Sequence, residues 1–463
     1  MSARAVAKRV GEALRAADAR GLNAVLHWSP ENLEREADRV DAMGGTPGPL
    51  HAVPVAVKDN IATLDAPTTC GSRILEGYRS PFEATAIRRL REAGALIAAK
   101  TNLDEFAMGS STEHSAFGRV VHPEDPSRVP GGSSGGSGAL VAAGVVPAAL
   151  GSETGGSVRQ PASFCGIVGV KPSYGRVSRY GLVAFGSSLD VISVFGRTVG
   201  DAASVLSVIS GHDPLDATTV DAPPVAPLEQ LEDLRGLTIG LPREYYPSDL
   251  DPGIRAGMNR AVAAMKELGA RMVEVSLPHS DYAVPTYYII APAEASANLA
   301  RYDGVRYGPP RPEGAADVRA LYRATRGRGF GKEVRRRILI GTYVLSAGYY
   351  EAYYGKAQRV RARLAADFAR VFEDGVDLLF TPTTPTTAFK AGEKTADPVA
   401  MYLADIFVCP VSLAGLPGMS VPIGRSEGLP VGGQLIAPYL CDERMLAVGA
   451  VLARHLDKDA EVR

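Results

Sequence analysis

Short apolar runs alternate along this chain with longer segments in which apolar and charged residues are mixed. Short buried strands are predicted at 51–60, 95–102, 237–242, 271–278 and 377–382. Helices are predicted at 3–19, from Pro30 to Gly44, and at 81–94, 254–269 and 348–373. Residues 138–153 combine a helix of small residues with a further buried strand. Because strands and helices alternate in this way, the pattern predicts an α/β layer structure.

The organisation of the chain is predicted to be simple. By length alone, 463 residues would suggest about three domains, but large α/β enzymes often build one sheet from a chain of this size. Residues 213–230 are rich in proline and predict a surface connection. We therefore expect a single domain over 1–463, with a helical insertion at approximately 280–375.

The amino-acid composition argues against only a few functional classes of protein. Lys and Arg number 50 against 51 Asp and Glu, so the overall charge gives no sign of a nucleic-acid surface. The four cysteines are far apart and match no metal-binding spacing, which is typical of reduced thiols in a cytoplasmic protein. We expect no secretory leader and no membrane helix, since the N-terminus lacks an apolar core and no apolar run reaches about 18 residues.

The stretch VPGGSSGGSGALVAAG, residues 129–144, contains the chain's densest cluster of glycine and serine, and GSETGGSVRQP follows at 151–161. A flexible linker is a poor interpretation, because the stretch continues into an apolar segment and linkers are polar throughout. A phosphate-binding loop requires Gly-Lys followed by Ser or Thr. The two Gly-Lys pairs are followed by Glu333 and Ala357, which makes a phosphate loop a weak alternative.

A serine nucleophile explains these glycines better, and GGSSG matches the GxSxG pattern at Ser133. An esterase of that type needs a downstream histidine, but His212, His279 and His455 all lie outside site-like contexts. Lys58 ends an apolar strand, and burial there would lower its pKa and supply a neutral amine as the base. The residues alone leave open an esterase, a nucleotide-binding module and a serine–lysine enzyme.

Three motifs in order resemble the amidase signature family: VAVKDN at 55–60, GGSSGGSGALVAAG at 131–144, and GSETGGSVRQPASFCGIVGVKPSYGRVSRYG at 151–181. The resemblance implies an α/β fold with a large mixed central sheet covered by helices on both faces. It also implies a catalytic triad, with Ser157 as the nucleophile, Ser133 as a bridging serine after a cis peptide bond, and Lys58 as the base.

Two further roles follow from the same resemblance. The backbone N–H groups of Thr154, Gly155 and Gly156 would form the oxyanion hole, where glycine permits a tight turn. Ser134 and Ser137 would have no catalytic part and would only bond the loop to itself.

Other segments, including TNLDEFAMGSSTEHSAFG at 101–118 and VSLAGLPGMSVPIG at 411–424, resemble the amidotransferase branch of this family, its glutaminase subunits. The resemblance implies hydrolysis of glutamine, with the ammonia used to transamidate Glu-tRNA(Gln), Asp-tRNA(Asn) or both. It implies B and C subunits as partners and tRNA held through the complex. No cofactor would bind this chain, and a partner would use ATP and Mg. A freestanding amidase acting on small or peptide amides is the alternative.

The branch also implies residues that bind glutamine: Arg337 for the α-carboxylate, Asp405 for the α-ammonium, and Tyr287 as part of the pocket wall. A bidentate guanidinium suits a carboxylate. The alternatives are a solvated helix-face charge for Arg337, which follows two other arginines, and a helix or turn cap for Asp405.

This sequence departs from the family pattern at two places beside these motifs. Glu153 stands where the family usually has Asp, next to the predicted oxyanion loop. Val191, Ser193 and Val194 replace the usual Gln, Gly and Pro in a segment expected to be a loop. These changes bear on packing around the serines and leave the predicted triad intact.

Overall fold

The strands of this protein form one mixed sheet, seen in a computed structural model that describes residues 2–44, 48–248, 250–307 and 316–458. Within these residues the sheet has eleven strands in the order β1-β3-β2-β4-β6-β5-β10-β11-β9-β7-β8. The strands are β1 Val25–His27, β2 Pro54–Lys58, β3 Leu96–Thr101, β4 Ala148–Glu153, β5 Val168–Lys171, β6 Val191–Gly196, β7 Thr238–Pro242, β8 Arg271–Val275, β9 Leu378–Pro382, β10 Gly418–Ser426 and β11 Leu429–Ile436.

Parallel and antiparallel pairings are both present in the sheet. β2 runs parallel to β3 and β4, and β7 runs parallel to β8 and β9. The strands between these two groups pair antiparallel, as does β1 with β3. The predicted mixed sheet is therefore confirmed.

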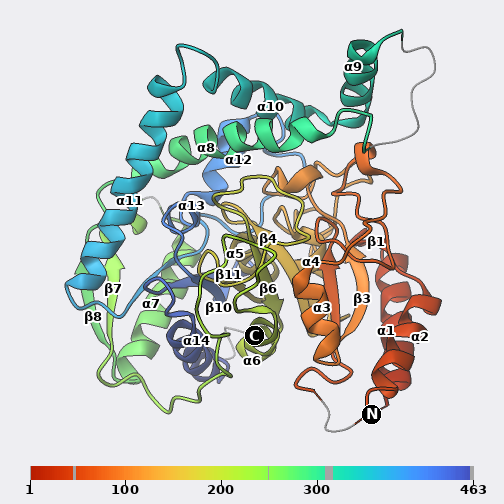
Figure 1. The fold of residues 1–463 in the computed structure, drawn as a ribbon. Coiled ribbons are helices and arrows are strands. Elements are labelled where there is room, and N and C mark those ends of the chain that lie inside the picture. The colour runs from red at the N-terminus through yellow and green to blue at the C-terminus, as the bar shows by residue number, and fades with distance from the viewer. Residues whose placement is uncertain (1, 45–47, 249, 308–315, 459–463) are drawn as a thin grey trace.

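Helices cover both faces of the sheet, as the layers in Figure 1 show. Alternate residues of a strand point to opposite faces, and β2 illustrates the division. Val55 and Val57 join the core that includes α3, α6, α7 and α14, whereas Ala56 joins the core beneath α1, α2, α4 and α5. These helices are α1 Ala3–Ala19, α2 Pro30–Asp41, α3 Thr85–Glu92, α4 Gly135–Ala142, α5 Arg159–Cys165, α6 Val199–Ile209, α7 Pro252–Glu267 and α14 Asp442–Leu456.

Four further helices lie along the top and the left side of Figure 1. They are α8 Ala283–Asn298, α9 Val318–Gly329, α10 Lys332–Val344 and α11 Lys356–Glu373. For the helix predicted at 348–373, the predicted start is wrong, because residues Glu351–Gly355 form a π-helical turn before α11 begins. The short helices α12 Pro398–Tyr402 and α13 Cys409–Leu413 follow β9.

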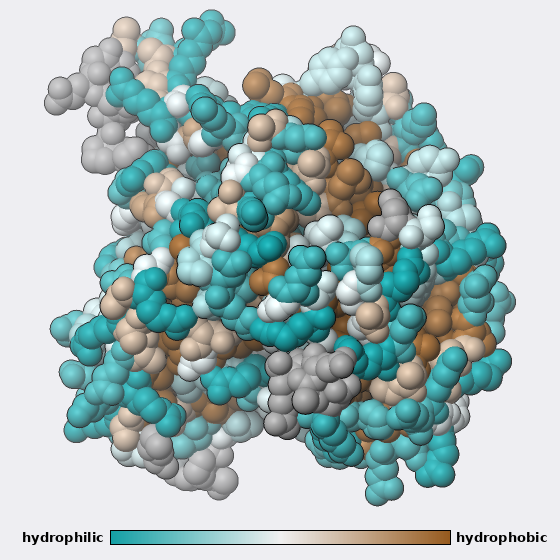
Figure 2. All heavy atoms as spheres, turned by 180° about the vertical axis from the view of Figure 1, so that it is seen from behind, coloured by the Kyte–Doolittle hydropathy of each residue, from teal (hydrophilic) through white to brown (hydrophobic). Residues whose placement is uncertain are grey.

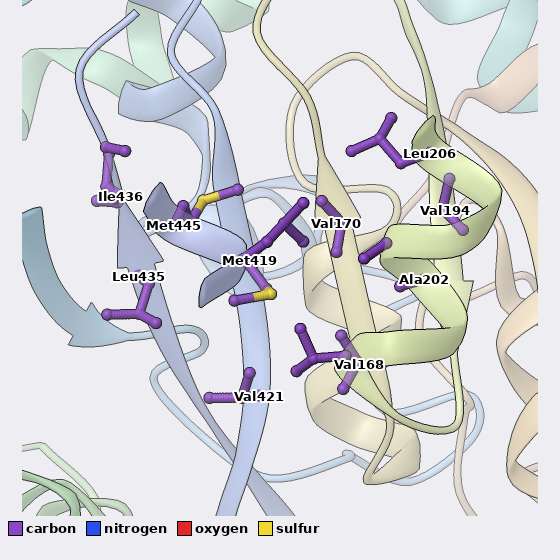
Figure 3. Close-up of a cluster of buried hydrophobic side chains, with 14 of the residues drawn as sticks. Val168, Val170, Val194, Ala202, Leu206, Met419, Val421, Leu435, Ile436 and Met445 are labelled. Carbon is purple, nitrogen blue, oxygen red and sulfur yellow. The ribbon is translucent and has the colours of Figure 1, made fainter. Parts of the chain in front are cut away.

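The centre of the sheet is packed with aliphatic side chains. Figure 3 shows Val168 and Val170 of β5 beside Met419 and Val421 of β10, with Leu206 of α6 close by. Residues 213–230 form neither helix nor strand, as expected for a connection. The surface seen from behind is mostly hydrophilic (Figure 2), and none of the described helices is long and apolar enough to cross a membrane.

Candidate active site

The residues of the predicted triad converge at the carboxyl ends of two neighbouring parallel strands. Lys58 is the last residue of β2, and β4 beside it ends at Glu153. The loop that carries Ser157 follows β4 directly, and the loop that carries Ser133 leads into α4. The carboxyl ends of parallel strands are where α/β sheets commonly hold their ligands, because the connecting loops leave a crevice there.

Lys58 is fully buried and faces two serine hydroxyl groups. Its Nζ lies 2.8 Å from Ser133 Oγ and 2.8 Å from Ser134 Oγ, and 3.3 Å from the carbonyl oxygen of Ser152. Burial lowers the pKa of Lys58 to about 7, although the nearby carboxylates of Asp104 and Asp190 act in the opposite direction. A substantial fraction of this lysine is therefore neutral near pH 7, with a lone pair available to a hydroxyl proton.

The two serine loops are joined through their backbones. The peptide bond between Gly132 and Ser133 is cis, as the family resemblance implied. The amide of Ser134 donates to the carbonyl of Ser157 at 3.2 Å, and the amide of Asp104 donates to the carbonyl of Ser133 at 3.1 Å. Ser157 is 6% exposed. The structure thus brings Lys58, Ser133 and the Ser157 loop into one buried cluster.

The orientation of the predicted oxyanion loop is fixed by side chains that hold one carbonyl group. The carbonyl oxygen of Gly155 accepts hydrogen bonds from Arg159 Nη2 at 3.1 Å and Ser412 Oγ at 2.7 Å. In a planar trans peptide the C=O and the following N–H point in opposite directions. The N–H of Gly156 is therefore turned away from Arg159 and is free of that network.

At both glycines of this loop, a side chain would crowd a neighbouring residue. A Cβ on Gly155 would lie 3.0 Å from the ring of Tyr287, and a Cβ on Gly156 would lie 2.2 Å from the side chain of Val408. The hydroxyl of Thr154 donates to Asp190 at 2.7 Å, which anchors the start of the loop. The ring of Tyr287 thus packs against Gly155 of the predicted oxyanion loop.

Glu153 and Arg159 form a fully buried ion pair beneath this loop. The Glu153 carboxylate accepts from Arg159 Nε at 2.7 Å, and from the amides of Val158 and Arg159 at 3.0 Å each. Arg159 also donates to the carbonyl of Val408 at 2.9 Å. The Glu153 side chain therefore reaches both the α5 backbone and the guanidinium, so this departure from the family pattern is accommodated without an unpaired charge.

The segment with the other departures is a strand, and the expectation of a loop there is wrong. Val191, Ser193 and Val194 are buried in β6, where they pair with Glu153, Gly151 and Leu150 of β4. Valine suits a pleated, buried position, whereas proline would remove a donor from the ladder. These substitutions therefore support the strand that backs the Ser157 loop.

Arg337 is buried, so its interpretation as a solvated helix-face charge is wrong. Its Nε donates to Glu333 on the same helix at 2.8 Å. The guanidinium lies over the rings of Tyr288 and Tyr402, 5.2 Å and 5.6 Å from their centroids. Arg336, by contrast, is 46% exposed at its side chain. Only the third arginine of this run enters the protein interior.

Asp405 is buried beside the serine loop, and its two oxygens differ. Oδ2 accepts a hydrogen bond from the hydroxyl of Ser110, whereas Oδ1 has no partner within the described residues. Oδ1 lies 3.0 Å from where a Cβ on Gly156 would be. Burial raises the pKa of Asp405 to about 7. Its carboxylate makes this side-chain contact instead of capping a helix, so the interpretation as a cap is wrong.

A cavity of about 300 Å³ borders Arg337. Arg337, Glu333 and Tyr402 line one part of it, and Lys394 and Gly109 line another. Neither Ser133 nor Ser157 lines this cavity. It gives access to the Arg337 side of the site.

The histidines considered as alternative bases have partners away from the serines. His279 Nδ1 lies 2.9 Å from Asp367, and His455 Nε2 lies 3.1 Å from Glu267. His212 Nδ1 lies 3.3 Å from Thr219 Oγ1. A histidine-dependent esterase has no support from these contacts.

Sequence reasoning missed several residues of this cluster. Ser134 contacts Lys58, and Ser137 donates to the carbonyl of Leu150 at 2.9 Å, so neither serine merely bonds its own loop. Ser110 and Gln160 join the site through contacts between segments far apart in sequence. Arg159 and Gln160 follow Ser157 closely in the third motif, which was the available signal.

The sequence profile of the amidase family matches residues 10–446, and this chain belongs to that family. Among curated relatives, the A subunit of glutamyl-tRNA(Gln) amidotransferase from Carboxydothermus hydrogenoformans is 58% identical over 417 residues, which cover 90% of this chain and 86% of the relative. The protein of the same name from Acidobacterium capsulatum is 53% identical over 95% of this chain and 93% of its own.

Solved structures agree with this assignment and with the amidase-signature fold. The crystal structure of the corresponding glutamyl-tRNA(Gln) amidotransferase protein from Thermotoga maritima matches with a TM-score of 0.81 and 45% identity, covering 98% of this chain and 92% of that chain. A peptide amidase from Stenotrophomonas maltophilia matches with a TM-score of 0.82 and 29% identity, covering 100% and 95%.

Proposed function

We propose that this chain is the glutaminase component of a tRNA-dependent amidotransferase and that it releases ammonia through Lys58, Ser133 and Ser157. The observation that carries the proposal is the fully buried Lys58 amine, 2.8 Å from Ser133 Oγ and with its pKa lowered to about 7 by burial. A charged lysine has three donors and no acceptor, so only the neutral form can act as a base.

The reaction starts with proton transfer away from the nucleophile. Neutral Lys58 Nζ takes the proton of Ser133 Oγ, which takes that of Ser157 Oγ as Ser157 attacks the side-chain amide carbon of glutamine. The developing oxyanion is bound by the N–H groups of Thr154, Gly155 and Gly156, and one such donor typically contributes about 3 kcal/mol. The proton returns to the leaving nitrogen, ammonia departs, and water hydrolyses the glutamyl ester on Ser157.

Free glutamine is recognised by residues other than the triad. Arg337, packed against two tyrosine rings, binds the α-carboxylate through its remaining donors. The unpartnered Oδ1 of Asp405 accepts from the α-ammonium, which replaces the missing hydrogen bond. Tyr287 closes the pocket over Gly155.

The names of the relatives support membership of a larger assembly. We propose that B and C subunits bind this chain, that tRNA is held through the complex, and that a partner uses ATP and Mg while this chain binds neither. The ammonia would serve Glu-tRNA(Gln), as in the names of the relatives, or Asp-tRNA(Asn). A freestanding amidase has weaker support, since the matching peptide amidase is 29% identical against 53–58% for these relatives.

The decisive experiment measures ammonia release from glutamine by the complex purified with its partners. Ser157→Ala should abolish release, whereas Ser137→Ala, in the same serine-rich stretch as Ser133 but bonded to Thr101 and Leu150, should retain it. Ser157-independent glutamine hydrolysis would refute the mechanism. Hydrolysis of small amides without preference for glutamine, by a chain that recovers no partner, would favour the freestanding amidase.

A further inference from the structure

The two oxygens of the Asp405 carboxylate differ: one has a hydrogen-bond partner in the protein, and the other has none within the described residues. Its Oδ2 accepts from Ser110 Oγ, and its Oδ1 is buried without a partner within the described residues. Asp405 is 5% exposed, so water cannot readily satisfy the free oxygen. A buried oxygen without a hydrogen-bond partner is costly, which favours a ligand that brings a donor.

Ser110 is itself held in place from the serine loops. Its carbonyl oxygen accepts from Gln160 Nε2 at 2.8 Å, and Oε1 of the same amide accepts from the N–H of Gly132 at 3.0 Å. Gln160 and Ser110 are 0% and 1% exposed. One buried side-chain amide therefore ties the loop of Ser133 to the residue that contacts Asp405.

We propose that Ser110 is a positioning residue that makes the site select amides carrying an α-ammonium group. Its hydroxyl donates to Oδ2 and so fixes the plane of the carboxylate, which leaves Oδ1 without a partner beside Gly156. A substrate ammonium at Oδ1 then lies next to the residue that precedes Ser157. This inference rests on the proposed function, in which Asp405 binds the ammonium of glutamine.

The charges around Asp405 fit this role. Burial raises the pKa of Asp405, as does the charge of Glu153, whereas the hydrogen bond from Ser110 and the charges of Arg337 and Arg159 lower it. Arg159 is already engaged by Glu153 and Arg337 by Glu333. Without a cation from the substrate, Oδ1 stays unsatisfied, whereas a substrate without an ammonium gains nothing from it.

The test compares two substrates on the purified complex: L-glutamine, and glutaric acid monoamide, which has the same amide and carboxylate but no amino group. Ser110→Ala should raise the KM for glutamine about tenfold, the effect of losing one hydrogen bond to a charged group, with kcat changed less than about twofold. The kinetics of the monoamide should stay unchanged. Ser110→Thr, which keeps the hydroxyl, should restore the KM for glutamine.

The matched control is Ser111→Ala, because Ser111 is equally buried and its hydroxyl has no partner within the described residues. Equal glutamine KM values for Ser110→Ala and Ser111→Ala would overturn the inference, as would an equal rise in KM for both substrates. The variant Asp405→Asn distinguishes a failure of the Ser110 inference from a failure of the proposed function, in which Asp405 binds the ammonium of glutamine. A raised glutamine KM in Asp405→Asn would leave the ammonium assignment standing, and an unchanged KM would refute that assignment and the role of Ser110 with it.

Discussion

Replacing Lys58 with methionine should remove activity and change how stability depends on pH. The unfolded chain keeps the Lys58 proton up to its ordinary pKa of 10.5, whereas the folded protein loses it near 7. Between these values the unfolded state binds one more proton, so the free energy of unfolding of the wild type rises with pH through this window. Methionine carries no proton in either state, and the variant lacks this contribution.

The size of the effect follows from the lowered pKa of Lys58. Each pH unit in the window is worth about 1.4 kcal/mol, which amounts to about 5 kcal/mol between pH 7 and 10.5. The free energy of unfolding of Lys58→Met minus that of the wild type should therefore be largest at pH 7 and below. It should fall by about 1.4 kcal/mol per unit as pH rises. The hydroxyls of Ser133 and Ser134 lose a partner, which adds an offset that does not depend on pH.

Urea unfolding at equilibrium, measured at half-unit steps above pH 7, would record this slope, and ammonia release would record activity. Lys171→Met is the matched control. Lys171 is also fully buried, burial lowers its pKa to about 7, and its Nζ donates to the carbonyl of Leu416 at 2.6 Å, outside the triad. It should show the same slope and keep its glutaminase activity.

A difference in unfolding free energy that stays constant with pH would refute the reasoning. It would mean that Lys58 keeps its proton in the folded protein, and the neutral base of the proposed mechanism would be absent. If Lys171→Met were inactive although normally stable, a loss of activity in Lys58→Met would no longer identify Lys58 as the base.

Three further outcomes are expected. The kcat/KM for glutamine should rise at least about tenfold per unit below pH 7 and level off above it as Lys58 of the free enzyme loses its proton; a flat profile would count against a lysine base. Glu153→Gln should lower the free energy of unfolding by about 3–5 kcal/mol in urea titrations, because it leaves Arg159 buried and uncompensated, and a loss below about 1 kcal/mol would contradict this. Arg337→Lys should raise the KM for glutamine about tenfold or more in steady-state assays, since an ammonium cannot make a bidentate contact; an unchanged KM would remove Arg337 from the pocket.

Local pattern is enough to predict the strands that are short, apolar and bounded by polar residues. β2 and β9 are of this kind, and Pro30 after Ser29 correctly marks the start of α2. β10 and β11 escape prediction because glycine and proline interrupt them, and these residues normally argue against a central strand. β1 has only three residues, too few for any periodicity.

The site is less accessible to local reasoning, because its contacts join distant segments. Lys58 and Ser133 are 75 residues apart, and only the family resemblance pairs them. The Arg337–Glu333 pair has helical spacing, but its burial against two tyrosines depends on other elements. Ser110 and Asp405 are 295 residues apart, and the sequence around neither residue predicts the hydrogen bond between them.

The chain also separates two tasks along its length. The proposed base, bridging serine and nucleophile lie on β2 and on the loops around α4 and β4, whereas Tyr287 and Arg337 of the proposed glutamine pocket lie on the helices α8 and α10. Changes in those helices can alter which amide is admitted without disturbing the proton path. Such a division favours gene duplication followed by divergence, since the helices of a copy can change while its hydrolytic machinery is kept.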